Sequence, residues 1–196
     1  MKIGVLLSGC GVYDGAEIHE SVLTLLSIEE IHATAVCISI NKDQHHVVNH
    51  ATGKEMRETR NMLTESARIA RGDIHDINSI SPADIDALVI PGGFGNAKNL
   101  TNWAFNGPDG KILPEVKLLI INMINVGKPI AALCVSPVVL AKALEGSDIE
   151  PTLTIGTDKE ESPYDIQGFT GGLEKTGMLT KMKTVREILV DPKNKI

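Results

Sequence analysis

The sequence predicts an α/β fold, a three-layer sandwich in which a mostly parallel sheet carries helices on both faces. Two observations lead to this prediction. Short, continuously apolar segments alternate along the chain with segments of helical periodicity, and three of the apolar segments run directly into turns rich in glycine, cysteine or proline. Strands that are apolar throughout are buried on both faces, as they are in a parallel sheet between two helical layers.

Four apolar segments are predicted to form the strands of this sheet. The segments are residues 3–7, 33–40, 87–90 and 129–134. The second is rich in β-branched side chains, which favour strands. The first, third and fourth end at Gly9-Cys10-Gly11, Pro91-Gly92-Gly93 and Cys134-Val135-Ser136. Because ligands bind beyond the carboxyl ends of parallel strands, we expect these three turns to form a site.

Four helices are predicted where apolar residues recur every three or four positions. They cover residues 17–31, 59–71, 114–126 and 138–144. Residues 156–177 contain many helix-breaking residues and little periodicity, so they are predicted to form a long loop. Residues 187–190 are predicted to form a strand and residues 191–194 a turn. Since only two residues follow that turn, we expect the natural protein to continue with a strand and a helix.

Composition excludes several classes of protein. Nineteen basic residues against 25 acidic ones give a net charge of −6, and aromatic residues are scarce, so nucleic acid is not an expected partner. Three cysteines without CxxC spacing predict neither a disulfide framework nor a zinc site, and the His45-His46 pair lies in a polar segment. No secretory or membrane-spanning segment is apparent, so a cytoplasmic protein is expected.

Cys134 is the residue that the sequence singles out most clearly. It ends the segment 129–134 and has Ala132 two residues before it and Ser136 two residues after it. This spacing suits a nucleophile elbow, since the tight turn leaves no room for larger side chains. The positive end of the following helix is expected to lower the thiol pKa and favour the thiolate. An inert buried thiol would give the same pattern, so position alone leaves both interpretations open.

The turn after residues 87–90 supplies a second component of the predicted site. The N–H groups of Gly92 and Gly93 can turn toward a ligand and, with the N–H of Val135, hold an oxyanion. A plain tight turn after a strand would contain the same glycines.

Several motifs together resemble a known family. IDALVIPGGFG at residues 85–95 and PIAALCVSP at residues 129–137 resemble the ThiJ/PfpI branch of the class I glutamine amidotransferase-like superfamily. GVLLSGCGVYDGAEIHE at residues 4–20, with NHATG and LTIGTD further along, is similar to the ElbB proteins, also called sigma cross-reacting or enhancing lycopene biosynthesis proteins. The resemblance covers residues 1–196, and it implies one ThiJ/PfpI-like domain with a flavodoxin-like fold and Cys134 as nucleophile.

The resemblance also implies a glutamate that pairs with the nucleophile from the start of the first helix. Glu20 fits that position, and Glu17, three residues earlier, is the alternative. Many relatives carry a triad histidine after the strand that follows the nucleophile helix, but residues 153–158 contain none. His19 is a possible auxiliary base, although a surface histidine is the simpler interpretation. Cys10 is expected at the same sheet edge, either lining the pocket or resolving an oxidised Cys134, or as a small thiol without a role.

The implied function is a cofactor-independent glyoxalase, a lyase that converts glyoxal and water to glycolate through a hemithioacetal on Cys134. The resemblance further implies a link to isoprenoid biosynthesis and a homodimer. A small polar pocket around the thiol is expected for such a carbonyl substrate. Two other functions stay open: a non-catalytic redox-sensing or metabolite-binding accessory protein, and, less well supported, a glutamine amidotransferase subunit.

Overall fold

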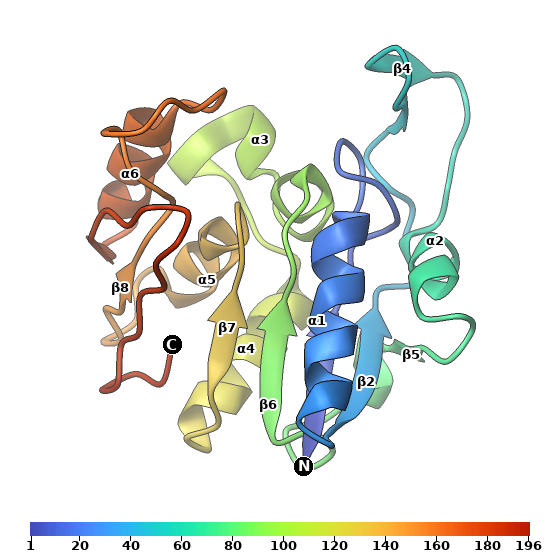
Figure 1. Ribbon diagram of the computed structural model, residues 1–196, viewed down its shortest axis with the longest axis horizontal. Helices are drawn as coiled ribbons and strands as arrows, with labels where there is room; N and C mark the ends of the chain where they lie inside the picture. The colour runs from blue at the N-terminus through green and yellow to red at the C-terminus, as the bar shows by residue number, and fades with distance from the viewer.

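The central sheet has five strands, all parallel, in the order β5-β2-β1-β6-β7, and confirms the predicted α/β sandwich (Figure 1). The computed structural model describes residues 1–196. The four predicted strands are all present, and a short edge strand, β5, adds to them. The strands are β1 (Lys2–Leu6), β2 (Thr34–Ser39), β5 (His75–Asp76), β6 (Ala87–Ile90) and β7 (Ile130–Ala132).

The predicted helices cover both faces of this sheet (Figure 1). Alternate side chains of each strand face opposite layers, so Val5 packs on the α1 side, while Leu88 packs on the α4 and α5 side. The larger of the two apolar cores lies on the second side. The helices are α1 (Ile18–Glu30), α2 (Met62–Ile69), α4 (Pro114–Asn125) and α5 (Pro137–Leu144).

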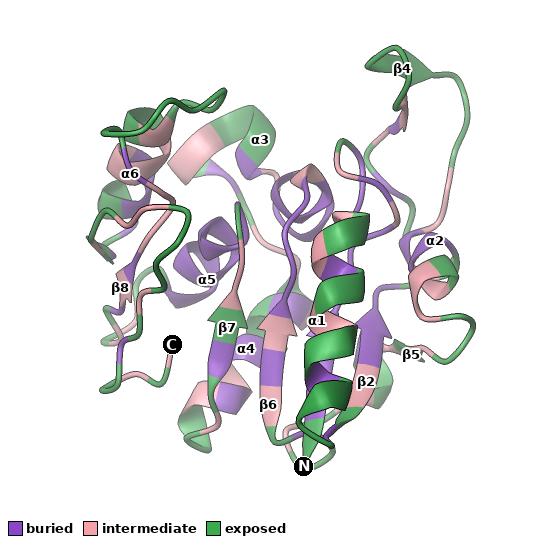
Figure 2. Ribbon diagram, viewed as in Figure 1, coloured by how far each residue is buried: buried purple, intermediate pink, exposed green.

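Helix α1 leaves most of its apolar side chains in solvent. Ser21 and Ile28 are its buried residues, whereas Ile18, Val22 and Leu26 are exposed and follow one another at four-residue spacing. Figure 2 shows this exposed face of α1 above the buried strands. The periodicity therefore predicts the helix correctly, but it does not identify the face that packs on the sheet.

The predicted loop at residues 156–177 is wrong in part, because it contains helix α6 (Ile166–Lys175). The Asp165 carboxylate caps the helix by accepting the Gly168 N–H at 2.9 Å. Glycines inside the helix weaken its propensity and conceal it in the sequence. One of them has a packing reason, since a Cβ on Gly172 would collide with the Trp103 ring.

The predicted strand at residues 187–190 is also wrong. This segment has no ladder partner, and Val185, Ile188 and Val190 are exposed. Local hydrogen bonds replace a ladder: the Glu187 N–H donates to the Thr184 carbonyl, and the Glu187 carboxylate accepts the Thr184 N–H. The predicted turn at residues 191–194 is present. After it, the Lys195 carbonyl accepts the Ile130 N–H at the edge of β7.

The remaining elements are short and lie around the sheet. The hairpin β3–β4 projects beyond α2, whereas α3, β8 and β9 lie on the β7 side near α6 (Figure 1). No helix is both long and apolar enough to span a bilayer. These elements are β3 (Val47–Asn49), β4 (Lys54–Met56), α3 (Trp103–Asn106), β8 (Thr152–Leu153), β9 (Leu179–Thr180), 3-10 turns at Ile77–Ser79 and Gly107–Asp109, and a π-helix at Asn96–Leu100.

Candidate active site

The turns that follow β1, β6 and β7 lie together at the carboxyl edge of the sheet. The Glu17 N–H, at the end of the first turn, donates to the Gly92 carbonyl at 2.8 Å. The Ser136 hydroxyl, after the third turn, donates to the Pro91 carbonyl at 2.7 Å. The middle turn is therefore tied to both of its neighbours, as the sequence predicts for adjacent parallel strands.

Cys134 occupies the sharp turn between β7 and α5. Its φ of 55° lies in the left-handed region that side chains other than glycine rarely adopt. The turn is held from both ends, because the Leu133 N–H donates to the Ile90 carbonyl at 3.0 Å and α5 begins at Pro137. This strained backbone is that of a nucleophile elbow, which lifts the side chain out of the sheet.

Asn96 is a supporting residue that the sequence does not single out. Its side-chain amide donates to the Pro91 carbonyl at 2.5 Å and to the Ser136 hydroxyl at 2.7 Å. Asn96 and Ser136 are both fully buried, so these bonds are shielded from water. Asn96 lies in the π-helix after the Gly92-Gly93 turn, and π-turns occur often beside functional sites.

Glu20 is the carboxylate that meets the thiol. One of its carboxylate oxygens accepts the Gly92 N–H at 2.6 Å, and the carboxyl group is hydrogen-bonded to Cys134. A Cβ on Gly92 would overlap both the Glu20 carboxyl group and the Cys134 Cβ. The expected role of Gly92 is corrected accordingly: its N–H is engaged by Glu20 and is not free for an oxyanion. Because Gly92 has no side chain, the Glu20 carboxyl group and the Cys134 thiol can approach each other.

The expected lowering of the Cys134 thiol pKa is wrong. The Cys134 residue is exposed at the site, but the atoms packed around its sulfur desolvate it in part, and this, followed by the negative charge of Glu20, raises the pKa of this thiol to about 11. The N–H groups of Val135 and Gly93 act in the opposite direction, but they do not outweigh these two effects. Burial likewise raises the pKa of Glu20. Burial therefore disfavours the charged form of both groups, and the negative charge of Glu20 disfavours the thiolate further.

The two remaining predicted donors lie beside the sulfur. The N–H groups of Gly93 and Val135 both hydrogen-bond to Cys134. Gly93 has a φ of 112°, and a Cβ there would collide with the backbone at Gly15 and Glu17. An oxygen formed next to the sulfur would find these N–H groups within reach.

Four other residues considered in the sequence lie away from the sulfur. Glu17 caps α1 by accepting the Glu20 N–H at 2.7 Å, and its second oxygen pairs with His19 at 2.9 Å. The His19 side chain is 88% exposed. Cys10 is half-buried with Glu65, Arg68 and Asp14 among the charges around it, and burial raises its pKa. The third cysteine, Cys37, is buried in β2.

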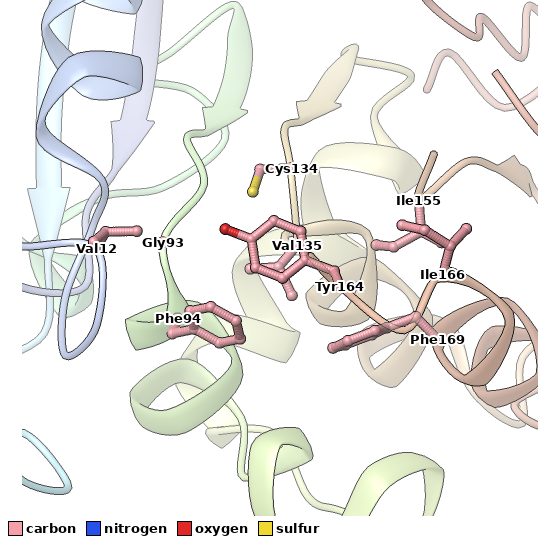
Figure 3. A pocket seen from close by; sticks show the side chains of 9 residues that line it. All are labelled: Val12, Gly93, Phe94, Cys134, Val135, Ile155, Tyr164, Ile166 and Phe169. Atoms are coloured by element: carbon pink, nitrogen blue, oxygen red, sulfur yellow. The ribbon is translucent and has the colours of Figure 1, made fainter. Parts of the chain in front are cut away.

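A pocket opens directly over the sulfur, and its lining is apolar (Figure 3). The expected small polar pocket is therefore wrong for this cavity, and the polar side chains near the thiol, among them Glu20 and Lys183, line the adjoining groove instead. The nine residues that line the apolar pocket include no charged side chain, and three of them are aromatic. They are Val12, Gly93, Phe94, Cys134, Val135, Ile155, Tyr164, Ile166 and Phe169. The sequence does not reveal this wall, since four of its nine residues come from residues 155–169, a segment in which α6 is not predicted.

The stretch at residues 153–158 lies at the site but brings no base to it. Ile155 lines the apolar pocket, and Gly156 lines the groove that joins Cys134 to Glu20. His45 stacks on Phe105, with ring centroids 4.1 Å apart, and lies outside the site. No group of three or more His, Cys, Asp or Glu side chains is arranged to hold a metal ion.

Comparisons with known proteins find full-length similarity. The chain is 41% identical over 197 residues to the human mitochondrial glutamine amidotransferase-like class 1 domain-containing protein 3, and covers 72% of it. It is 39% identical to the mitochondrial ES1 protein homolog of Rattus norvegicus, and covers 73% of that protein. In both cases the whole chain is matched. No family model matches.

A comparison with solved structures also finds similarity to a protein with an amidotransferase-like domain. The crystal structure of an isoprenoid biosynthesis protein with an amidotransferase-like domain from Ehrlichia chaffeensis superposes with a TM-score of 0.88 at 37% identity. That match covers all of this chain and 84% of the other. Drosophila melanogaster DJ-1beta superposes with a TM-score of 0.53 at 16% identity, which shows a shared fold alone.

Proposed function

Because the chain belongs to the glutamine amidotransferase-like class 1 domain family that includes the ES1 proteins, we propose that it is a cofactor-independent enzyme of the glyoxalase type. It converts glyoxal and water to glycolate through the sulfur of Cys134. The observation that carries this proposal is the arrangement around that sulfur: a nucleophile elbow, a hydrogen-bonded carboxyl group from Glu20, and two backbone N–H groups. These are the components needed to add a thiol to a carbonyl group.

The first step is addition of the Cys134 sulfur to one aldehyde carbon of glyoxal. The thiol is protonated at rest because its pKa is about 11, so attack requires a base that takes the proton as the S–C bond forms. The Glu20 carboxylate is hydrogen-bonded to the thiol and takes that role. The carbonyl oxygen becomes an oxyanion near the N–H groups of Gly93 and Val135, and Glu20 passes the thiol proton to it, which gives a hemithioacetal and regenerates the Glu20 carboxylate.

The second stage moves hydrogen between the two carbons. Glu20 removes the proton from the carbon bonded to sulfur, which gives an enediol, and a proton is delivered to the neighbouring carbon. The first carbon is oxidised to a thioester while the second is reduced to an alcohol, so no external oxidant or reductant is consumed. Water then hydrolyses the thioester, which releases glycolate and returns the proton to the thiol.

Within the family, we assign the protein to the ElbB group on the motif at residues 4–20, together with NHATG and LTIGTD further along the chain. A role connected with isoprenoid biosynthesis fits this assignment. The name of the Ehrlichia chaffeensis relative supports it. A strain lacking the protein is expected to change its isoprenoid content, and wild-type content in such a strain would count against the connection.

Glutamine amidotransfer is less well supported by the same site. Glutamine carries an α-ammonium and an α-carboxylate group, and the apolar pocket over Cys134 offers no charged side chain to either; the charged side chains near the sulfur, Glu20, Lys183 and Glu187, lie in the adjoining groove. No histidine is present at residues 153–158 to activate the thiol. A redox-sensing role also has weaker support, since oxidation follows thiolate character and the Cys134 thiol is protonated at neutral pH.

The proposal is tested by a panel of glyoxal and glutamine assayed with wild-type protein and with Cys134→Ser. We expect glycolate from glyoxal in the wild type and its loss in the variant, without release of ammonia from glutamine in either. Glutaminase activity that depends on Cys134 would show that the protein is an amidotransferase and would overturn the glyoxalase proposal. A catalytic efficiency far below ~10⁴ M⁻¹s⁻¹ on glyoxal would contradict a dedicated glyoxalase.

A further inference from the structure

We infer that Phe94, Tyr164 and Phe169 form a specificity subsite for an apolar, preferably aromatic, substituent on the carbonyl substrate of Cys134. This inference rests on the proposed function for its reaction. It extends that function from glyoxal to α-oxoaldehydes of the form R–CO–CHO, in which R is uncharged and apolar.

The distribution of aromatic residues is the first argument. The whole chain has six: three Phe, two Tyr and one Trp. Three of the six line the apolar pocket over the Cys134 sulfur, whereas the larger groove that also reaches Cys134 contains no aromatic residue. The Phe94 and Tyr164 rings are tilted with their centroids 6.0 Å apart, which is a favourable aromatic contact. In Figure 3 the sulfur points toward the space that these side chains enclose.

The chemistry of the lining is the second argument. Aliphatic side chains of Val12, Val135, Ile155 and Ile166 complete the wall, and none of the nine lining residues is charged. Lys98 lies with its Nζ 5.7 Å from the Phe94 ring centroid, but it does not line the pocket and donates to the Tyr13 carbonyl. A charged substituent would lose its hydration in this pocket without gaining a partner, whereas an apolar one would be stabilised.

The size of the pocket limits the substituent. Its volume is about 90 Å³, less than the roughly 150 Å³ of a protein cavity that encloses benzene. Tyr164 is 50% exposed, so the pocket is open on that side. A single ring therefore enters with its outer edge at the opening.

The aromatic wall is held in place by helix packing. Phe169 lies on α6, which is capped by Asp165 and packs closely on Trp103 through Gly172. Tyr164 directly precedes this cap. Because α6 is packed against the rest of the fold, the side chains of the subsite are held in place. The pocket is therefore largely preformed, as ligand-binding pockets usually are.

The first experiment measures the pocket independently of turnover. Cys134 is alkylated with iodoacetamide and with its N-phenyl analogue iodoacetanilide; sulfur displaces iodide in both, and only the second carries a ring. The ratio of the two rate constants is divided by the same ratio for glutathione. We expect a normalised preference of about tenfold for iodoacetanilide, the equivalent of ~1.4 kcal/mol for partial burial of one ring.

Matched variants locate the preference. Tyr164→Ala and Phe169→Ala are each expected to reduce it to about threefold or less, whereas Tyr164→Phe retains it because the ring remains. Phe105→Ala is the control, since Phe105 is an aromatic side chain of similar exposure, at 46%, outside the pocket. A normalised ratio near one in the wild type, or one unchanged in both alanine variants, would overturn the inference.

The second experiment compares glyoxal with phenylglyoxal as substrates. We expect kcat/KM for phenylglyoxal to exceed that for glyoxal by about tenfold, and Phe169→Ala to remove the difference mainly through KM. If the alkylation preference is present but neither aldehyde is turned over, the subsite stands and the glyoxalase proposal fails. If both aldehydes are turned over with equal efficiency and the alkylation ratio is near one, the glyoxalase proposal stands and the subsite is wrong.

Discussion

Replacement of Glu20 by glutamine should separate the reactivity of the thiol from catalysis. The variant keeps the size of the side chain but removes its negative charge, which is the second-largest cause of the raised Cys134 pKa after burial. With a pKa of about 11, about one thiol in a thousand is ionised at pH 8. Each unit by which the pKa falls therefore raises the thiolate fraction about tenfold.

The size of the expected change is bounded by the structure. Full return to the ordinary value of 9.0 would increase thiolate at pH 8 by about 100-fold, but burial remains in the variant, so the gain is smaller. We expect Glu20→Gln to be alkylated by iodoacetamide at least about threefold faster at pH 8. Its pH profile should move to lower pH, because removing a nearby negative charge stabilises the thiolate.

Turnover should change in the opposite direction. Without a carboxylate to accept the thiol proton and move hydrogen between the carbons, glycolate formation is expected to fall by about 10²–10⁴-fold. Alkylation is located by peptide mass spectrometry, and Glu29→Gln, which removes an exposed charge at the far end of α1, is the control. A Glu20→Gln protein that is alkylated no faster than wild type, or that retains wild-type turnover, would refute this account of the pair.

Three substitutions test the packing that supports the site. Gly92→Ala places a methyl group against the Glu20 carboxyl and should cost about 1–3 kcal/mol in urea unfolding while reducing turnover; unchanged values of both would show that the contact is not needed. Ser136→Ala removes two buried hydrogen bonds, so the free energy of unfolding should fall by about 1–3 kcal/mol, and a Tm within 1 °C of wild type would be inconsistent with that loss. Gly172→Val pushes α6 away from the ring of Trp103, the only tryptophan, so its fluorescence should shift toward that of an exposed indole; an unchanged spectrum would mean that the helix does not move.

The central sheet could be predicted from the sequence because its signals are local. Residues 87–90 are apolar throughout and residues 129–134 nearly so, and each ends at a turn of small residues, so both the strand and its end are visible. Cys134 is visible for the same reason, since a nucleophile elbow constrains its immediate neighbours. The preference for Glu20 over Glu17 comes from the family resemblance and not from the residues themselves. Both lie near the start of α1, and only the position of Gly92 brings one of them to the sulfur.

Features that depend on contacts between distant segments could not be predicted. Helix α6 has three glycines, which oppose a helix locally, and Gly172 is explained only by Trp103 packing against it. The apolar pocket has the same origin, because its aromatic residues come from segments about seventy residues apart. The thiol pKa also depends on burial by the assembled site, which outweighs the N–H groups beside the sulfur that favour the thiolate.

The most direct test of the central claim is the rate of glycolate formation from glyoxal by wild type, Cys134→Ser and Cys10→Ser. Cys10 lies at the same edge of the sheet but lines neither the pocket nor the groove at Cys134, so it controls for loss of a thiol. We predict a loss of at least about 1,000-fold in Cys134→Ser and a rate close to wild type in Cys10→Ser. A Cys134→Ser protein that forms glycolate as fast as the wild type would contradict the claim that the reaction passes through this sulfur.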